Sequence, residues 1–209
     1  MNFSKLRQAE AAFLHRYPGG FDNPEILATR VKKHKPDQMI ALARESFAKG
    51  NFKLPDLIVQ NMIKVISRSS IISVFEKPRF RDFANSLPSQ EKEFLSSGMK
   101  ELLHGDEQTG FEMTLDLMKS GKIAKWSLMT VCQTYFHPQR DVFIKPTTVK
   151  GVIEFFELEN LHYKPSPSWE FYEAYRSAFY EMKSKVDKSL SPTNAAFSGF
   201  LWMTIRREL

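Results

Sequence analysis

Histidine, cysteine and paired carboxylate side chains are the groups of this sequence that could act as general acids, nucleophiles or metal ligands. The five histidines lie far apart, and none has a second ligand at a spacing that would place two metal-binding side chains on one helix face. Cys132 lies among apolar residues, where a thiol behaves as a small hydrophobic side chain. Glu154 and Glu157 could meet on one helix face, but the apolar residues around them claim its interior side. These patterns predict neither a metal site nor a cofactor.

The motifs that mark common enzyme sites are absent from this sequence. It has no glycine-rich phosphate loop, no dinucleotide-binding fingerprint, no zinc-peptidase motif and no hydrolase nucleophile elbow. The sequence therefore favours a protein that is not an enzyme. A catalytic site that converges from distant residues would escape a motif search, and for that alternative the first residues to test are His137, Arg140 and Asp141.

The stretch of residues 122–164 has the order of elements found in helix-turn-helix DNA-binding domains that carry a wing. It predicts a helix, a break, a second helix that begins at Pro146 with small hydroxyl residues, and then a short extended segment. In such domains the second helix meets base edges, while flanking cations meet phosphates. We expect base contacts from Thr147, Thr148, Lys150 and Gly151, and phosphate contacts from Lys145, His162 and Lys164.

Two features argue against this hypothesis. The connection of about nine residues between the two helices is longer than the usual turn of 3–4 residues. The second helix also carries three glutamates and one lysine, and glutamates in a DNA groove would be repelled by phosphates. A helix pair with a purely structural role is the alternative.

A second set of residues stands out on the helix expected from Ser168 to about Asp187. One arc of this helix is an ordinary apolar stripe. The adjacent arc mixes aromatic rings with cations, which suits base stacking, anion binding or a protein interface; its members are Trp169, Tyr172, Arg176, Tyr180 and Lys183. A helix wedged between two neighbours would instead bury both arcs and let the hydroxyl and cationic ends reach the edge.

Together these segments favour a non-enzymatic binding or regulatory protein that associates with nucleic acid, DNA in particular, through its C-terminal third. In this hypothesis cations hold phosphates and aromatic rings stack on bases. The phosphate contacts would be Lys145, Lys150, Lys164, Arg176 and Lys183, and the stacking rings would be Trp169, Tyr172 and Tyr180. The alternative is a protein-interaction module, a homo-oligomer or an adaptor, that uses the same aromatic helix face.

The elements that must position these residues are helices, because apolar residues recur at helical spacing along most of the chain. The pattern predicts an all-α fold of about nine helices, with at most a short β-hairpin between 142–144 and 161–164. We expect a single helical domain over residues 1–209. If the chain divides, the polar loop 104–110 separates an N-terminal part, 1–104, from a C-terminal part, 111–209.

Prolines and capping residues mark several helix starts. Asn23 can cap a helix that has Pro24 at its first position. The most apolar stretch opens at Pro55, and we expect its helix to continue through Ile71, Ile72 and Phe75.

The composition is that of a globular chain in a reducing compartment. Of 209 residues, 42% are hydrophobic and 13% aromatic, which excludes disorder, and the single cysteine excludes a disulfide scaffold. No uncharged apolar run approaches the ~20 residues needed to span a bilayer, and the first residues lack the order of a signal peptide. We expect a cytoplasmic protein without a membrane partner.

The positive charge of the sequence is unevenly distributed. The net charge is +6, yet residues 1–80 alone carry 14 Lys and Arg against 7 Asp and Glu. Four of these cations, Arg30, Lys32, Lys33 and Lys35, lie together at the end of a predicted helix, where they offset the helix dipole. Either a solvated helix end or a patch that binds an anionic ligand accounts for them.

Overall fold

The computed structural model of the chain describes residues 1–206, except for the side chains of residues 29–31 and 33. Within this range the chain is all-α, as the sequence predicts. The α-helices are α1 (Phe3–Arg16), α2 (Pro24–His34), α3 (Pro36–Ser46), α4 (Pro55–Arg68), α5 (Glu76–Ser86), α6 (Ser89–His104), α7 (Glu107–Ser120), α8 (Trp126–Phe136), α9 (Pro146–Phe155), α10 (Trp169–Lys183) and α11 (Asn194–Ile205). Three short 3-10 helices, η1 (Gly20–Asp22), η2 (Lys49–Lys53) and η3 (Lys188–Leu190), lie in the connections.

Local side-chain chemistry explains several of these starts. The Asn23 side chain accepts a hydrogen bond from the Glu25 backbone N–H, with Pro24 at the first helical position, as predicted. The Ser168 side chain likewise caps α10. The last helix, α11, begins at Asn194, where the Thr193 side chain accepts a hydrogen bond from the Ala196 N–H.

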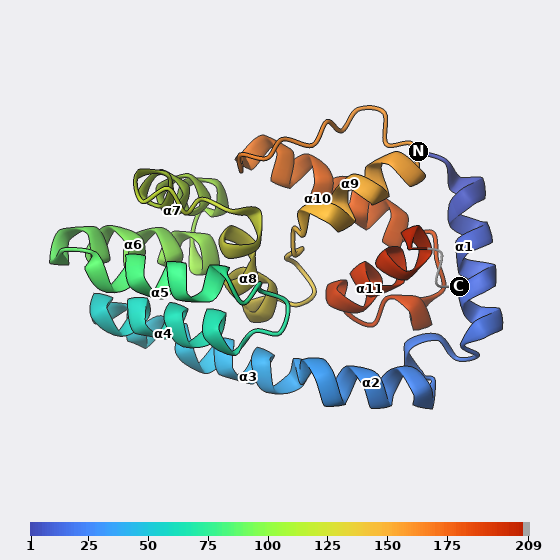
Figure 1. The fold of residues 1–209 in the computed structure, drawn as a ribbon, viewed down its shortest axis with the longest axis horizontal. Coiled ribbons are helices and arrows are strands. Elements are labelled where there is room, and N and C mark those ends of the chain that lie inside the picture. The colour runs from blue at the N-terminus through green and yellow to red at the C-terminus, as the bar shows by residue number, and fades with distance from the viewer. Residues whose placement is uncertain (207–209) are drawn as a thin grey trace.

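Figure 1 shows the helices in two groups with α8 between them. The α3–α7 group contains the closely packed pair of α6 and α7, with α4 against α6 and α5 against α4. The second group, which we call the α9–α11 group, also contains α1, and in it α11 packs on α9 and α1. Helix α2 follows one edge of the molecule and leads from α1 to α3 (Figure 1).

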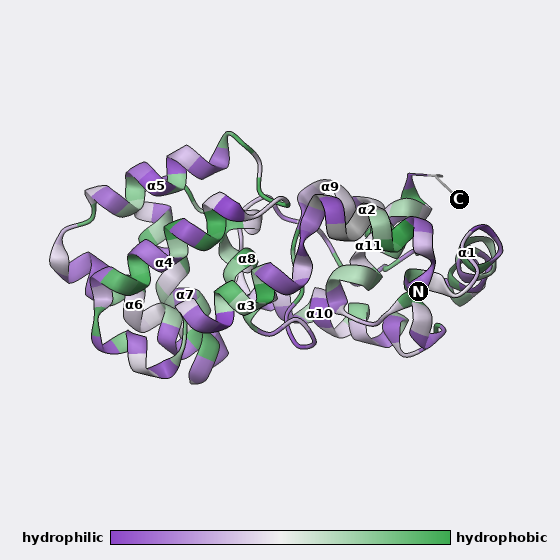
Figure 2. Cartoon of the chain, turned by 90° about the horizontal axis from the view of Figure 1, so that it is seen from below, coloured by the Kyte–Doolittle hydropathy of each residue, from purple (hydrophilic) through white to green (hydrophobic). Residues whose placement is uncertain are grey.

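Helix α8 is the most enclosed element of the fold. Its residues from Trp126 to Tyr135 are all buried, including the only thiol of the chain, that of Cys132. Figure 2 shows hydrophilic residues, in purple, interspersed with hydrophobic residues, in green, along outer helices such as α1 and α5. Because α8 is enclosed on every side, it is the axis around which the other elements pack.

The α6–α7 connection is short and tightly packed. Gly110, in the first turns of α7, lies so close to α6 that a side chain there would collide with the Leu102 backbone. The polar loop expected over 104–110 is therefore a brief turn, in which the Asp106 carboxylate accepts a hydrogen bond from the Thr109 N–H at 2.7 Å. The division of the chain into 1–104 and 111–209 stays a prediction.

No β-hairpin forms within residues 1–206, so the all-α fold holds without the short hairpin that the sequence allowed. Residues 142–144 belong to no helix or strand, and the backbone N–H groups of Val142 and Ile144 donate to side chains. The Val142 N–H donates to the Tyr172 hydroxyl at 3.2 Å, and the Ile144 N–H donates to the Thr130 hydroxyl at 3.0 Å. Hydrogen bonds to side chains replace the ladder that a second strand would supply.

Helix α4 ends earlier than its apolar pattern predicts. It stops at Arg68, and Ser69 takes an extended conformation with its side chain accepting a hydrogen bond from the Ile71 N–H. Serine competes for backbone hydrogen bonds in this way, which explains the break. The chain then forms the α4–α5 loop, residues 69–75, before α5 begins at Glu76.

Candidate functional site

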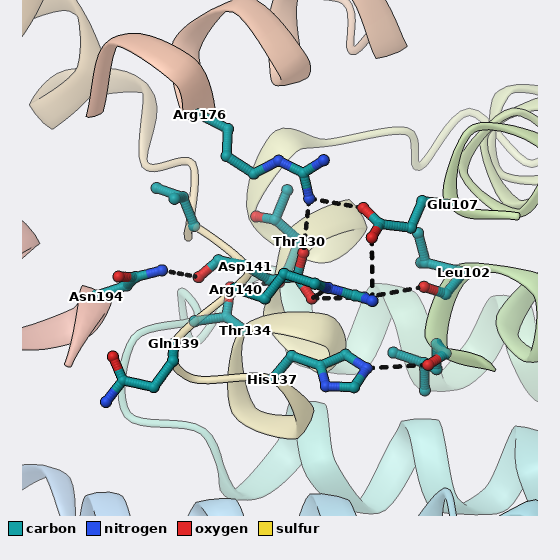
Figure 3. Close-up of polar contacts among 12 residues, drawn as sticks. Leu102, Glu107, Thr130, Thr134, His137, Gln139, Arg140, Asp141, Arg176 and Asn194 are labelled. Atoms are coloured by element: carbon teal, nitrogen blue, oxygen red, sulfur yellow. Dashed lines mark hydrogen bonds and ion pairs between the residues drawn. The ribbon is translucent and has the colours of Figure 1, made fainter. Parts of the chain in front are cut away.

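The three residues proposed for an enzyme site lie together on the turn that follows α8. The Arg140 and Asp141 backbone N–H groups both donate to the His137 carbonyl, which folds this turn back on itself. Asp141 is 1% exposed and is surrounded by polar side chains from other elements (Figure 3). We call Glu107, Arg140, Asp141, Tyr172 and Arg176 the Asp141 cluster.

Ion pairs connect the cluster in a closed arrangement. Arg140 contacts Glu107 at 3.0 Å and Asp141 at 3.0 Å. Arg176 contacts the same two carboxylates, at 2.6 Å for Glu107 and 3.3 Å for Asp141. The Tyr172 hydroxyl donates to Asp141 Oδ1 at 3.1 Å, the same oxygen that Arg176 contacts, while Arg140 contacts Oδ2. Both oxygens of Asp141 are thus occupied by partners within the protein.

A second layer of polar residues holds the turn in place. Tyr180 donates its hydroxyl proton toward the carbonyls of Gln139 and Arg140. The Asn194 amide donates to the Asp141 carbonyl at 3.1 Å, and its own oxygen accepts from the Lys183 ammonium at 2.8 Å. On the opposite side, the His137 Nε2 lies 2.9 Å from the Leu103 carbonyl (Figure 3).

Burial dominates the electrostatics of this region. It raises the pKa of Asp141, against the opposing effect of the Arg140 guanidinium. Burial also raises the pKa of Tyr172 and lowers the pKa of His137. Desolvation is the largest single effect on Arg176 and would lower its pKa, but the hydrogen bond to Glu107 and the nearby charges, including Glu107 and Glu173, together outweigh it and raise the pKa.

The Asp141 cluster joins the two helix groups. Glu107 lies on α7, and Arg176 and Tyr172 lie on α10, so the pairs bridge elements that are far apart in the sequence. Two surface grooves, of about 520 and 220 Å³, lie along α1 and contain no residue of the cluster. Perturbed pKa values occur in structural ion-pair networks as well as in active sites. The arrangement is that of a structural joint, since its polar atoms bind one another.

The aromatic and cationic arc of α10 faces the protein interior. Tyr172 is fully buried and stacks on Phe111 of α7, with ring centroids 5.7 Å apart. Arg176 lies over the rings of Trp169 and Tyr172, at 5.6 and 5.3 Å. Lys183 and Tyr180 bind the turn described above. In this structure the ring of Tyr172 has no surface on which a base could stack, because α10 is wedged between neighbours.

The residues proposed to read DNA lie on α9 and on the segment after it. Lys145, Thr147, Lys150 and Lys164 are exposed, whereas Thr148 is buried. A side chain at Gly151 would meet Ile205 of α11, so this position faces the protein. The Lys150 ammonium lies 4.9 Å from the centre of the Tyr163 ring, which brings α9 next to residues 162–164. The structure therefore brings together only some of the residues that were predicted to contact DNA.

Sequence reasoning missed the most exposed large apolar residues described in this chain. Val74 and Phe75, in the α4–α5 loop, are 71% and 78% exposed. The sequence pattern placed Phe75 on the buried stripe of a long helix. The serines at positions 69, 70 and 73 were the available sign that the helix would end before it.

Metal-ligand clusters and membrane-spanning helices were the remaining kinds of site that the described part of the chain could show. In residues 1–206, no group of three or more His, Cys, Asp and Glu side chains could hold a metal ion. None of the helices described is long and apolar enough to cross a bilayer. Comparison of the chain with protein-family models, with curated proteins and with solved structures finds no match.

Proposed function

We propose that this protein is a non-enzymatic interaction module of the cytoplasm that binds a protein partner through the α4–α5 loop. The observation that carries the proposal is the exposure of Val74 and Phe75, side by side, on a loop whose backbone is held in place. Clustered apolar side chains left in solvent are typical of protein interfaces.

Contacts on both sides of the exposed pair fix the loop. The Ser69 hydroxyl lies 3.0 Å from the Tyr135 hydroxyl, in the protein interior, and Ile72 is 4% exposed. After the pair, the Glu76 carboxylate accepts a hydrogen bond from the Ser127 hydroxyl at 2.9 Å. A loop that is ordered before binding loses less conformational entropy when a partner docks.

Quantitative affinity enrichment tests this proposal. Tagged wild-type protein, the double variant Val74→Ser/Phe75→Ser and the control Leu54→Ser are each incubated with extract of the source cells. Leu54 is 60% exposed at the opposite end of α4, so its substitution also removes an exposed apolar side chain, but one that lies away from the loop. We expect proteins that bind the wild type and the control but are lost from the double variant. A set of bound proteins identical for all three baits would contradict the proposal.

Nucleic-acid association is the second candidate, and the exposed cations around α9 favour it. Lys145, Lys150 and Lys164 are exposed and form no ion pair with the described residues. Glu154 is exposed on the same helix and would oppose phosphate binding. Mobility-shift titrations at several salt concentrations test this candidate, because the salt dependence should fall by about one counterion for each lysine changed to glutamate. Absence of any shift at low salt would rule it out.

A further inference from the structure

We infer that the partner segment bound by the α4–α5 loop is acidic, with carboxylates on both sides of an apolar anchor that packs on Val74 and Phe75. This inference rests on the proposed function and adds the chemistry of the partner. It is drawn from the charges around the exposed pair.

Cations flank the exposed pair along the chain. Arg68 and Arg79 are exposed, and Lys77 is half-buried. The ion pairs of the described residues leave all three without an acidic partner. The carboxylate that follows Phe75 in the chain, that of Glu76, accepts a hydrogen bond from the Ser127 hydroxyl. The rim of the apolar pair is therefore positively charged.

A contact between distant segments adds further cations. The His34 side chain, at the end of α2, lies 2.9 Å from the Ser70 hydroxyl of the loop. This contact brings the α2–α3 junction, with the exposed Lys32 and Lys35, to the same part of the molecule (Figure 1). Arg30 and Lys33, from the same basic run, lie outside the described side chains. One exposed carboxylate, Asp37, follows at the start of α3, so positive charge remains in excess.

An apolar centre with a charged rim is the usual anatomy of a protein interface. The apolar centre contributes most of the affinity, while the rim selects a partner of opposite charge and speeds association. A segment with Asp or Glu on either side of a Leu, Phe or Trp complements both parts of this surface.

The composition of the centre favours protein over nucleic acid. Single-stranded nucleic acid is held by successive aromatic platforms along a cationic groove. Here one aromatic ring, Phe75, has an aliphatic neighbour, Val74, and the adjacent Glu76 is acidic. An aliphatic side chain beside a single ring suits an apolar amino-acid side chain better than a series of bases.

Selection from a random linear peptide library displayed on phage tests the inference even while the natural partner is unidentified. The baits are the wild type, Val74→Ser/Phe75→Ser and the control Leu54→Ser. We expect the wild type and the control to enrich peptides that combine Asp or Glu with a large apolar residue, and the double variant to lose them. Because both substituted side chains are exposed, the thermal unfolding curves of all three baits should coincide.

Charge reversal then separates the charged rim from the apolar centre. A synthetic peptide with the enriched sequence, labelled with a fluorophore, is titrated against the wild type and against Lys77→Glu/Arg79→Glu. The reversal should weaken binding by about tenfold or more and reduce its dependence on salt. Reversal of Lys100, an exposed cation on α6, is the matched control and should leave the affinity unchanged.

The outcomes distinguish the partner chemistry from the proposed function. Enriched peptides without acidic residues, or peptides that bind the double variant equally, would overturn the acidic-segment inference. If cell proteins still bind in a Phe75-dependent way, the interaction module itself stands. Preferential binding of labelled single-stranded DNA at the same loop would show that the partner is nucleic acid and not a protein segment. Light scattering could instead reveal concentration-dependent dimers that the double variant abolishes. That result would show that the partner is a second copy of the chain.

Discussion

The Asp141 cluster and the α4–α5 loop place residues in environments opposite to those their chemistry prefers. In the cluster, two arginines and two carboxylates lie between α7 and α10, and Asp141 is 1% exposed. In the loop, Val74 and Phe75 lie in water although both are apolar. Charged groups tolerate enclosure when every one has partners, whereas exposed apolar groups gain nothing within the monomer. The comparison suggests that the polar region maintains the fold and the apolar region meets a partner.

Removal of Arg176 should give the largest effect, because it bridges Glu107 and Asp141. Arg176→Met leaves these carboxylates with only Arg140 as a cationic partner, and we expect the free energy of unfolding to fall by about 3 kcal/mol. Urea denaturation measures the change. Arg81→Met removes an exposed pair with Asp82 and is the control, with an expected cost below about 1 kcal/mol. Equal effects of the two substitutions would show that the cluster is not a joint.

Two apolar positions of the α4–α5 loop should differ sharply in stability. Ile72 is 4% exposed and anchors the loop, so Ile72→Ala should cost about 2–4 kcal/mol. Val74, two residues later, is 71% exposed, and Val74→Ala should change stability by less than about 0.5 kcal/mol. Thermal denaturation followed by circular dichroism compares the two. A large cost at Val74 would assign it to the core and remove the basis of the proposed interface.

Removal of the Tyr172 hydroxyl should lower the free energy of unfolding by more than the small size of this group suggests. It donates to Asp141 and accepts from the Val142 N–H, so Tyr172→Phe leaves two buried groups with one partner fewer. We expect a loss of about 1–3 kcal/mol in urea denaturation. The same change at Tyr163, which is half-buried at the edge of α9, should be nearly neutral.

The smallest effect concerns the edge of the cluster and is a dependence on pH. Burial lowers the pKa of His137 from its ordinary value of 6.5, so the folded state binds this proton less readily than the unfolded state. The stabilisation is present above the ordinary pKa and is lost as the pH falls through the lowered value. Between about pH 7 and pH 5, wild-type stability should therefore fall more steeply than that of His137→Gln. Parallel curves would indicate that His137 is solvated.

The sequence was sufficient to predict the helical class and many element boundaries. Asn23 with Pro24 correctly located the start of α2, because caps and prolines act within a few residues. The end of α4 was missed, since the apolar period continues through Phe75 and outweighed the weaker signal of three serines. In this segment the apolar periodicity favoured continuing the helix, whereas the serines favoured ending it.

The environment of the candidate site could not be predicted, because it depends on partners that are distant in the sequence. The aromatic and cationic arc of α10 was identified, but Phe111 and Glu107 of α7 decide that it is enclosed. His137, Arg140 and Asp141 were singled out together, yet a sequence does not show whether a cavity adjoins them. The residue types predicted where charged side chains would be concentrated. The groups that these side chains bind became evident only from the packing of the helices.

The enclosure of α8 also has a practical consequence for experiments on the loop. Burial raises the pKa of Cys132 to about 12, so the only thiol of the chain stays protonated and shielded at neutral pH. A cysteine introduced by Phe75→Cys would then be the single accessible thiol. A fluorescent or crosslinking label could be attached there without first removing the native cysteine, and would report directly on whatever approaches the loop.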